Sequence, residues 1–172
     1  MYSGFKPKEP EKAVSELRKG VALEPNNADA LAELAYTLVF AGRPDEATEL
    51  IRKATRLNPN FPPWYHRPAG IAHYMRGDYA QAVPEFKAWY ESERSEGQSL
   101  AWLAAAYAQT GDIAASRNAI SKLPRRRGAS VPQWNFWTQQ TFANQHVFAR
   151  DEDKQRFMDG LGKAGVRNAL DD

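Results

Sequence analysis

Residues 28–59 carry the pattern that most constrains the fold of this chain, because two apolar stripes of helical period flank a turn signal. The first stripe is spaced i, i+3, i+4, i+7, which is one face of a helix, and it comprises Leu31, Leu34, Ala35 and Leu38. Gly42 then breaks the helix, and Pro44 suits the first turn of a new one, where its missing N–H is not needed. The second stripe comprises Ala47, Leu50, Ile51 and Ala54. Pro59 ends that helix because the residue before a proline is pushed out of the helical region. The segment predicts two antiparallel helices.

This helical pair recurs at a fixed interval. Pro25 and Pro59 are 34 residues apart, and the turn glycines Gly42, Gly77 and Gly111 are 35 and 34 apart. A 34-residue helix–turn–helix period is the signature of the tetratricopeptide (TPR) repeat. Three units resemble the TPR pattern of large and small residues in register: Leu31, Leu34, Ala35, Leu38, Ala47, Ile51 and Pro59; His66, Ala69, Gly70, His73, Ala82 and Phe86; Leu100, Leu103, Ala104, Tyr107, Ser116 and Ile120.

We therefore predict an all-α fold, a TPR-type α-solenoid of antiparallel helix pairs with a non-repeat helical cap at the C-terminus. The predicted parts are an irregular N-terminus (1–10), the TPR array (11–124), a basic linker (125–129), the helical cap (130–166) and a tail (167–172). The array divides into a half unit (11–27) and three units (28–60, 61–96 and 97–124).

The half unit is predicted to hold a helix over residues 11–23 with Ala13, Leu17 and Gly20 on its inner face. A solenoid unit cannot bury its face alone. Either the first residues cover that face or the chain is a piece of a longer protein, and we favour the second interpretation.

Two prolines interrupt the third unit, Pro68 in its first helix and Pro84 in its second. A proline inside a helix costs about 3 kcal/mol unless it lies in the first turn. We expect both prolines in early turns of short or bent helices. The result is either a kinked repeat or a widened groove.

The cap is predicted from two helical segments. Residues 131–145 place Trp134, Trp137 and Phe142 at helical spacings, as expected of a terminal unit that packs on the last repeat. Asp151 is a candidate N-cap for a final helix over about residues 152–164. That helix is expected to bury Phe157, Leu161 and Met158, and Gly165 is expected to end it.

Composition and charge argue against several classes of function. A net charge of +2 gives no general attraction to nucleic acid or membrane, so neither is expected as a partner. No apolar run is long enough to span a bilayer, and the first ten residues lack the apolar core of a signal peptide. There is no cysteine, and a cytoplasmic location is the default expectation. The run Arg125–Arg127 is interpreted as a solvated loop rather than a phosphate contact.

Catalytic patterns are missing from the sequence. His66 and His73 are seven residues apart, which is not the i, i+4 spacing of a zinc helix, and no flanking carboxylate completes a site. The third histidine, His146, stands alone. There is no Gly-rich phosphate loop and no GxSxG elbow. We predict no cofactor, no metal and no enzyme activity.

The binding prediction follows from repeat geometry, because the first helix of each unit lines the concave side of a TPR array. The predicted groove is apolar and aromatic, suited to a peptide or helix, and comprises Tyr36, Val39, Trp64, Arg67, Ile71, Tyr74, Met75, Trp102 and Gln109. Coverage of Trp102 by the cap is the alternative. Chaperone-binding TPR domains use Lys and Asn to hold a terminal carboxylate, but Ala32 and Tyr36 stand at those places, so no such clamp is expected.

Two stretches resemble a narrower family. Residues 58–66 with 76–79, and the ending 151–166, look like the C-terminal TPR region of bacterial class III adenylate/guanylate cyclase-like and winged-helix signalling proteins. Gly162 departs from that family, which usually has Arg there. The resemblance implies a scaffolding or regulatory role without cyclase chemistry, through a protein or peptide partner of unknown identity. The alternative is a self-association module that forms a homodimer.

Overall fold

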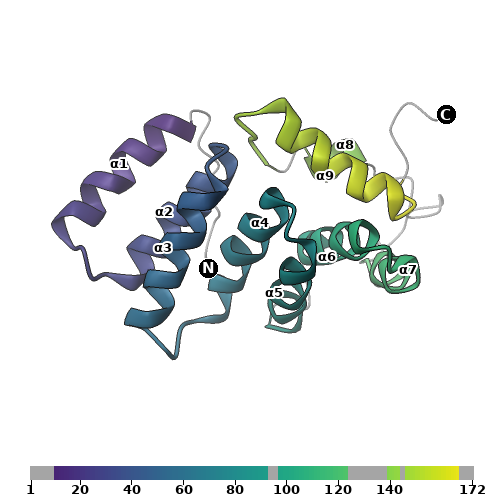
Figure 1. Cartoon of the computed structure of the whole chain (residues 1–172), viewed down its shortest axis with the longest axis horizontal. Helices are drawn as coiled ribbons and strands as arrows, with labels where there is room; N and C mark the ends of the chain where they lie inside the picture. The colour runs from purple at the N-terminus through teal and green to yellow at the C-terminus, as the bar shows by residue number, and fades with distance from the viewer. Residues whose placement is uncertain (1–9, 93–96, 124–138, 144–145, 167–172) are drawn as a thin grey trace, which may run out of the picture.

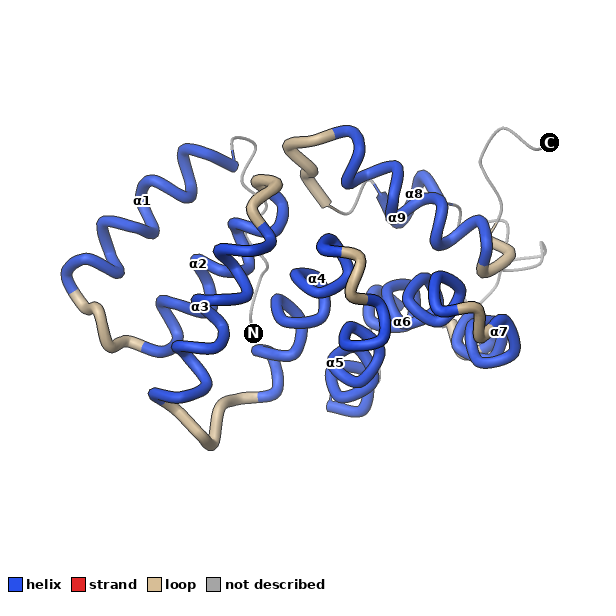
Figure 2. Tube along the Cα trace, in the orientation of Figure 1, coloured by secondary structure: helices blue, strands red, loops and turns tan. Residues whose placement is uncertain are grey.

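The computed structural model describes residues 10–92, 97–123, 139–143 and 146–166, and these ranges contain helices and no strand (Figures 1 and 2). The elements are α1 (Pro10–Leu23), α2 (Ala28–Phe40), α3 (Pro44–Leu57), the 3-10 turn η1 (Pro63–Tyr65), α4 (His66–Arg76), α5 (Tyr79–Ser92), α6 (Gly97–Thr110), α7 (Ile113–Ser121), α8 (Gln139–Ala143) and α9 (Asp151–Lys163). The all-α prediction is confirmed for this part of the chain.

The helices stack as an α-solenoid. The antiparallel pairs are α2 with α3, α4 with α5, and α6 with α7, and each pair packs on the next through α3 with α4 and α5 with α6. The first helices of successive pairs also touch, α2 with α4 and α4 with α6. These three helices form one layer, and α9 packs on α6 (Figure 1).

The periodic turn glycines have the conformation that their spacing predicts. Gly42, Gly77 and Gly111 have φ angles of 76°, 84° and 87°, in the left-handed region that other residues rarely adopt. The helix starts are satisfied by side chains at two places. Asn27 accepts a hydrogen bond from the Ala30 amide at 3.0 Å, and Asp112 accepts one from the Ala115 amide at 2.9 Å.

Small residues stand where paired helices approach closely. A Cβ atom on Gly70 of α4 would lie 2.6 Å from the Phe86 ring of α5. In the last pair, the buried Ser116 hydroxyl donates to the Ala104 carbonyl at 2.8 Å. These two positions explain why a glycine and a serine occupy the repeat pattern at residues that would otherwise be apolar.

The structure corrects two details of the helices in the array. Pro68 lies in the first turn of α4, as predicted. Pro84, however, is the sixth residue of α5, and this helix is not short, because it spans 14 residues in total. In α1 the buried residue is Val14, while Ala13 and Leu17 are half-buried and Gly20 is exposed. The inner face of α1 is therefore rotated from the predicted one.

The cap also differs from its prediction in part. Asp151 is the first residue of α9, and Arg150 occupies the N-cap position without a side-chain cap. Phe157 and Leu161 are buried as predicted, whereas Met158 is partly exposed. Gly165, with φ of 87°, ends the helix. Of the predicted aromatic segment, Phe142 is buried in α8 and the tryptophans lie outside the described residues, as do the basic linker and the tail.

Candidate functional site: the concave face

Helix α9 occupies the C-terminal part of the predicted groove. The Tyr74 hydroxyl donates a hydrogen bond to the Arg156 carbonyl at 3.1 Å, and the Arg156 guanidinium donates to the Met75 carbonyl. Near the other end of α9, the Lys163 ammonium donates to Gln109 Oε1 at 2.6 Å. These bonds connect α9 to both α4 and α6. We call Tyr74, Met75, Trp102 and Gln109 the closed section of the concave face.

An aromatic cluster fills the space between α9 and the closed section. Phe157 stacks on Trp102 with ring centroids 3.9 Å apart, and Tyr74 meets Trp102 edge-on at 5.3 Å. The Trp102 indole N–H donates to His146 Nε2 at 3.2 Å, so this ring nitrogen is the unprotonated one. His146 in turn stacks on Phe40 at 4.8 Å. The third histidine is therefore a buried packing residue.

Gly160 allows the close approach of α9. A Cβ atom at this position would lie 2.1 Å from the Tyr74 hydroxyl and 3.0 Å from the Ala105 Cβ. Any side chain larger than a hydrogen would push α9 away from α4 and α6. Gly160 of α9 and Ala105 of α6 are both small, and together they allow the two helices to touch.

The segment that leads into α9 is held against the turn between α2 and α3. The Ala149 amide donates to the Phe40 carbonyl at 2.7 Å. Arg150 makes two hydrogen bonds to Asp153, at 2.7 and 2.8 Å, and these bonds raise the pKa of Arg150. The Arg150 side chain lies so close to Gly42 that a Cβ there would be 2.5 Å from Nε. Asp153 is 1% exposed, so its carboxylate depends on this partner.

Much of the predicted groove is thus inaccessible. Five of its members are buried side chains: Val39, Ile71, Tyr74, Met75 and Trp102. Val39 and Ile71 belong to the core between the helices, and α9 with its aromatic cluster covers the other three. The structure supports the alternative in which the cap covers Trp102. While α9 stays in place, these five residues contact no partner.

The N-terminal part of the groove is partly exposed. Tyr36, Trp64, Arg67 and Gln98 are half-buried, and we call them the open section. The Arg67 guanidinium lies 4.4 Å from the centre of the Tyr36 ring and 5.3 Å from that of Trp89. It donates to the Tyr36 hydroxyl and, at 3.4 Å, to Gln98 Oε1. The Nε atom of Arg67 is buried without a hydrogen-bond partner among the described residues.

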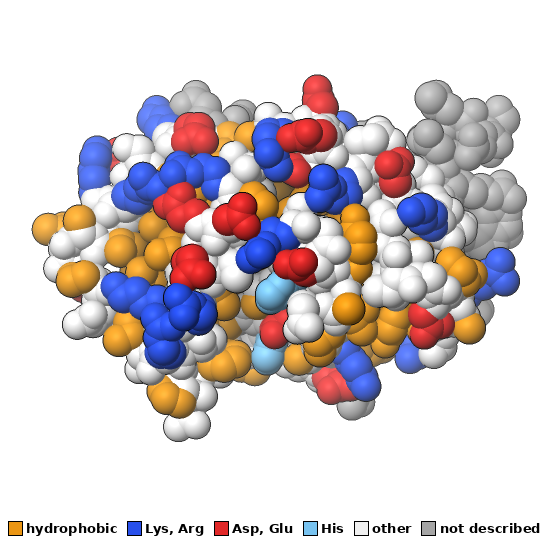
Figure 3. Space-filling model, in the orientation of Figure 1, with side chains coloured by type: hydrophobic (Ala, Val, Ile, Leu, Met, Phe, Trp, Pro, Cys, Tyr) orange, Lys and Arg blue, Asp and Glu red, His pale blue; other side chains and the backbone are white. Residues whose placement is uncertain are grey.

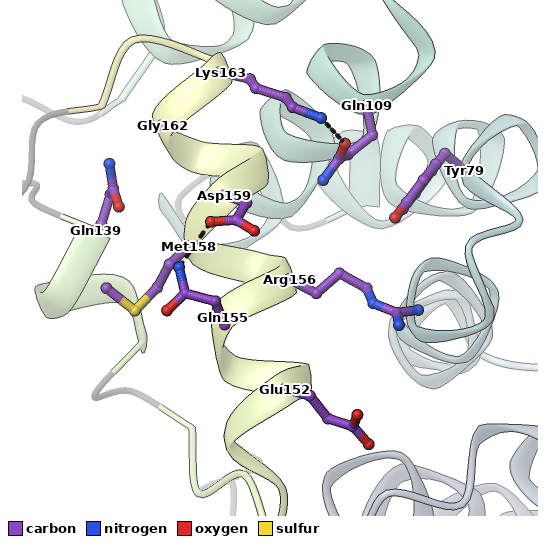
Figure 4. A pocket seen from close by; sticks show the side chains of 10 residues that line it. All are labelled: Tyr79, Gln109, Gln139, Glu152, Gln155, Arg156, Met158, Asp159, Gly162 and Lys163. Atoms are coloured by element: carbon purple, nitrogen blue, oxygen red, sulfur yellow. Dashed lines mark hydrogen bonds between the residues drawn. The ribbon is translucent and has the colours of Figure 1, made fainter.

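Two surface pockets border α9 and its entry segment. The larger, of about 680 Å³, runs along α9 beside Tyr79 and Gln109 (Figure 4). The smaller, of about 470 Å³, contains Arg43, Arg76 and Arg150. Each of these arginines is paired with a carboxylate, Arg43 with Glu46 at 2.5 Å and Arg76 with Asp45 at 3.3 Å, so the smaller pocket offers no uncompensated cation to an anion.

The remaining histidines form separate contacts. His66 Nδ1 lies 2.7 Å from Glu85, and His73 Nδ1 lies 3.9 Å from Asp78. Across the described ranges, no three His, Cys, Asp or Glu side chains gather as metal ligands. Helices with the length and apolar character to cross a bilayer are likewise missing from these ranges. Acidic and basic side chains alternate over the face in Figure 3, without a large area of one sign.

Comparison with known protein families and structures supports the same fold. Two family models for the tetratricopeptide repeat match, one over residues 5–66 and the other over residues 63–86 and 97–120, which together are well over half of the chain. The chain therefore belongs to the tetratricopeptide repeat proteins. This repeat fold is a protein-interaction scaffold, whose stacked units form extended binding surfaces.

Individual relatives are more distant. Protein SGT1 homolog of Bos taurus is 27% identical over 95 residues, which are 55% of this chain and only 28% of that protein's length. The structure of MamA 41-end from Desulfovibrio magneticus RS-1 is similar with a TM-score of 0.61 at 18% identity, over 92% of this chain and 85% of that one. The MamA RS-1 ArsTM double mutant gives 0.60 at 18%, over 91% and 83%. At this identity the likeness shows the fold alone.

Proposed function

We propose that this protein is a non-catalytic interaction module that binds a peptide or helix of a partner protein at the open section of its concave face. The observation that supports this most is that Tyr36 on α2, Trp64 on η1 and Arg67 on α4 are only half-buried. Aromatic and arginine side chains are the residues enriched among interface anchors. The closed section, by contrast, is already occupied by α9.

The chemistry of the open section favours a partner segment with an acidic residue beside an apolar one. Arg67 is held between Tyr36 and Trp89, so its planar guanidinium has a fixed orientation. The guanidinium carries the positive charge that would pair with a carboxylate of the partner, although its Nε–H is itself buried. An apolar neighbour of that carboxylate would pack on Trp64.

The closed section supports the choice of a peptide or helix as the ligand. There the array holds a helical segment through ring packing on Trp102 and through the Tyr74 hydroxyl, which donates to a main-chain carbonyl. Main-chain and ring contacts of this kind suit a segment of polypeptide. The open section lies on the same concave face, on α2, η1 and the N-terminal ends of α4 and α6.

The setting of this interaction rests on the resemblance of residues 58–66, 76–79 and 151–166 to bacterial signalling proteins. On that ground we place the module in a scaffolding or regulatory part of such a protein, in the cytoplasm. A second candidate function is self-association, which the charge pattern of α9 favours.

Selection from a random peptide library displayed on phage tests the binding proposal, because it does not require the partner to be identified first. Peptides selected on the wild-type protein are expected to contain an acidic residue next to an apolar one. Their affinity for the Arg67→Ala and Trp64→Ala variants should fall at least tenfold. The matched control is Leu23→Ala, because Leu23 is 85% exposed on α1, outside the open section. Selected peptides that bind all three variants equally well would refute the assignment.

A further inference from the structure

Four charged side chains form a stripe along one face of α9. Glu152, Arg156, Asp159 and Lys163 are spaced i, i+4, i+7 and i+11, which places them on the same side of a helix. All four line the larger pocket, and in Figure 4 the side chains of Glu152, Arg156 and Lys163 project to the same side of α9. Their charges alternate along the helix as minus, plus, minus, plus. We call these four residues the α9 charge stripe.

Pairing within α9 does not account for this pattern. The spacing would allow Glu152 to pair with Arg156, and Asp159 with Lys163, but their partners in the structure are different ones. Glu152 lies 3.1 Å from Arg150, and Asp159 accepts from Gln155 at 2.7 Å. Arg156 and Lys163 donate to uncharged oxygens of α4 and α6. The acidic and basic members of the stripe therefore do not neutralise one another within the helix.

The stripe is antisymmetric about the midpoint between Phe157 and Met158. Positions 152 and 163 are equidistant from that point and opposite in charge, and so are positions 156 and 159. Two copies of α9 laid antiparallel about a two-fold axis would bring Glu152 opposite Lys163 of the second copy. The same axis would bring Arg156 opposite Asp159 of the second copy. All four charges of each stripe would then face opposite charges.

We propose that the α9 charge stripe is the contact surface of a symmetric dimer in which two α9 helices pack antiparallel. A symmetric two-fold contact requires a surface complementary to itself, and an antisymmetric charge stripe is one. A parallel arrangement in the same register would instead place Glu152 against Glu152. The inference deepens the second candidate function by naming its surface, and it requires α9 to stay on α6.

The surroundings of the stripe provide apolar area and room. Met158 and Tyr79 are partly exposed at the larger pocket, and Gly162 presents no side chain on the outer face of α9. A partner helix can therefore approach closely at the ends of the stripe. Exposed ion pairs contribute little affinity each, but they determine which orientation and register two surfaces adopt. The charges thus specify the dimer, and the apolar contacts strengthen it.

Charge-reversal variants of the full chain test this arrangement by light scattering over a concentration series. The wild type should dimerise with a mass that depends on concentration and falls at high salt. The variant R156E/K163E carries four negative charges in the stripe, and E152K/D159K carries four positive ones, so each should dimerise at least tenfold more weakly. An equimolar mixture of the two should recover a dimer. Thermal unfolding of each variant checks that it is folded.

The fourfold variant E152K/R156E/D159K/K163E is the decisive control. It inverts every charge and keeps the antisymmetry, so it should dimerise more tightly than either half-reversed variant, although it loses the hydrogen bonds of Arg156 and Lys163 to α4 and α6. A wild type that stays monomeric to millimolar concentration would overturn the proposal. Half-reversed variants that dimerise like the wild type, or a mixture that does not recover the dimer, would overturn it equally. Peptide binding at Arg67 does not involve the stripe, so failure here leaves the binding proposal to its own test.

Discussion

The open and closed sections occupy different parts of one concave face and share α4 and α6, yet among the described residues α9 covers only the closed section. One difference is the size of the side chains at matching positions of α4 and α6. Ile71 on α4 has its equivalent 34 residues later in Ala105 on α6, and Arg67 has its equivalent in Ala101. The two alanines leave room for α9, whose Gly160 sits directly over Ala105.

This comparison shows that one repeat scaffold can use its inner face in two ways. Where α6 presents the small Ala105 beside Trp102, the array accepts α9 and gains a continuous core. Where it presents Tyr36, Trp64 and Arg67, the face keeps partly exposed rings and a cation. Substitutions in the closed section should therefore change the stability of the fold, and those in the open section should change binding.

The largest expected effect is at the centre of the closed section. Phe157→Ala removes the ring that stacks on Trp102 and should lower the free energy of unfolding by about 3–5 kcal/mol. Its neighbour Met158 is partly exposed, so Met158→Ala should cost less than about 1 kcal/mol. Urea unfolding followed by circular dichroism measures both. Equal losses for the two variants would mean that α9 is not packed as described.

A second prediction concerns the closest contact of α9. Gly160→Ala places a methyl group against the Tyr74 hydroxyl and should cost about 1–3 kcal/mol, although alanine favours a helix by about 1 kcal/mol. Gly162→Ala is the matched control and should cost less, because its Cβ would lie 3.0 Å from the end of a single side chain, Gln139. Adding Tyr74→Phe to Gly160→Ala removes the atom that clashes and should restore part of the loss. Additive effects in this double-mutant cycle would contradict the contact.

A third prediction concerns the ionisation of Tyr74 in the closed section. Burial raises the pKa of Tyr74 above its ordinary value of 10.0, because the folded protein disfavours the ionised phenol. The resulting stability is complete below pH ~10 and is lost as the pH rises above it, since the unfolded chain ionises first. Urea midpoints measured at increasing alkaline pH should fall, and they should fall less for Tyr74→Phe. Tyr65 contributes to the remaining loss, because its pKa is also raised by burial and by its hydrogen bond to Asp29. An unchanged slope in Tyr74→Phe would show that this phenol is accessible to water.

The sequence predicted the repeat but not which part of its inner face is covered by α9. Periodic glycines and apolar stripes specify helix pairs because both depend on local geometry, and Gly42, Gly77 and Gly111 all have the left-handed backbone that the turns need. Whether a concave position is open depends on a segment more than 50 residues away, which no local pattern encodes. One signal was present: α6 is apolar on all sides, and such a helix is buried all round.

The proposed self-association surface could not be found from the repeat pattern either. The antisymmetry of the α9 charge stripe can be read from the printed sequence only once the start and outer face of α9 are known. The buried side of α9, with Phe157 and Leu161, defines that outer face.

The smallest expected effect on stability lies in the open section. Arg67→Ala removes the guanidinium from the Tyr36 and Trp89 rings, and a partly exposed cation–π contact contributes about 0.5–1 kcal/mol. The matched control is Arg52→Ala, since Arg52 is 62% exposed on α3 and its pairing with Glu49 should contribute less still. Urea unfolding of both variants measures the difference. A loss at Arg67 as large as that of Phe157→Ala would mean that the open section is part of the core, and the contrast between the two halves of the concave face would then disappear.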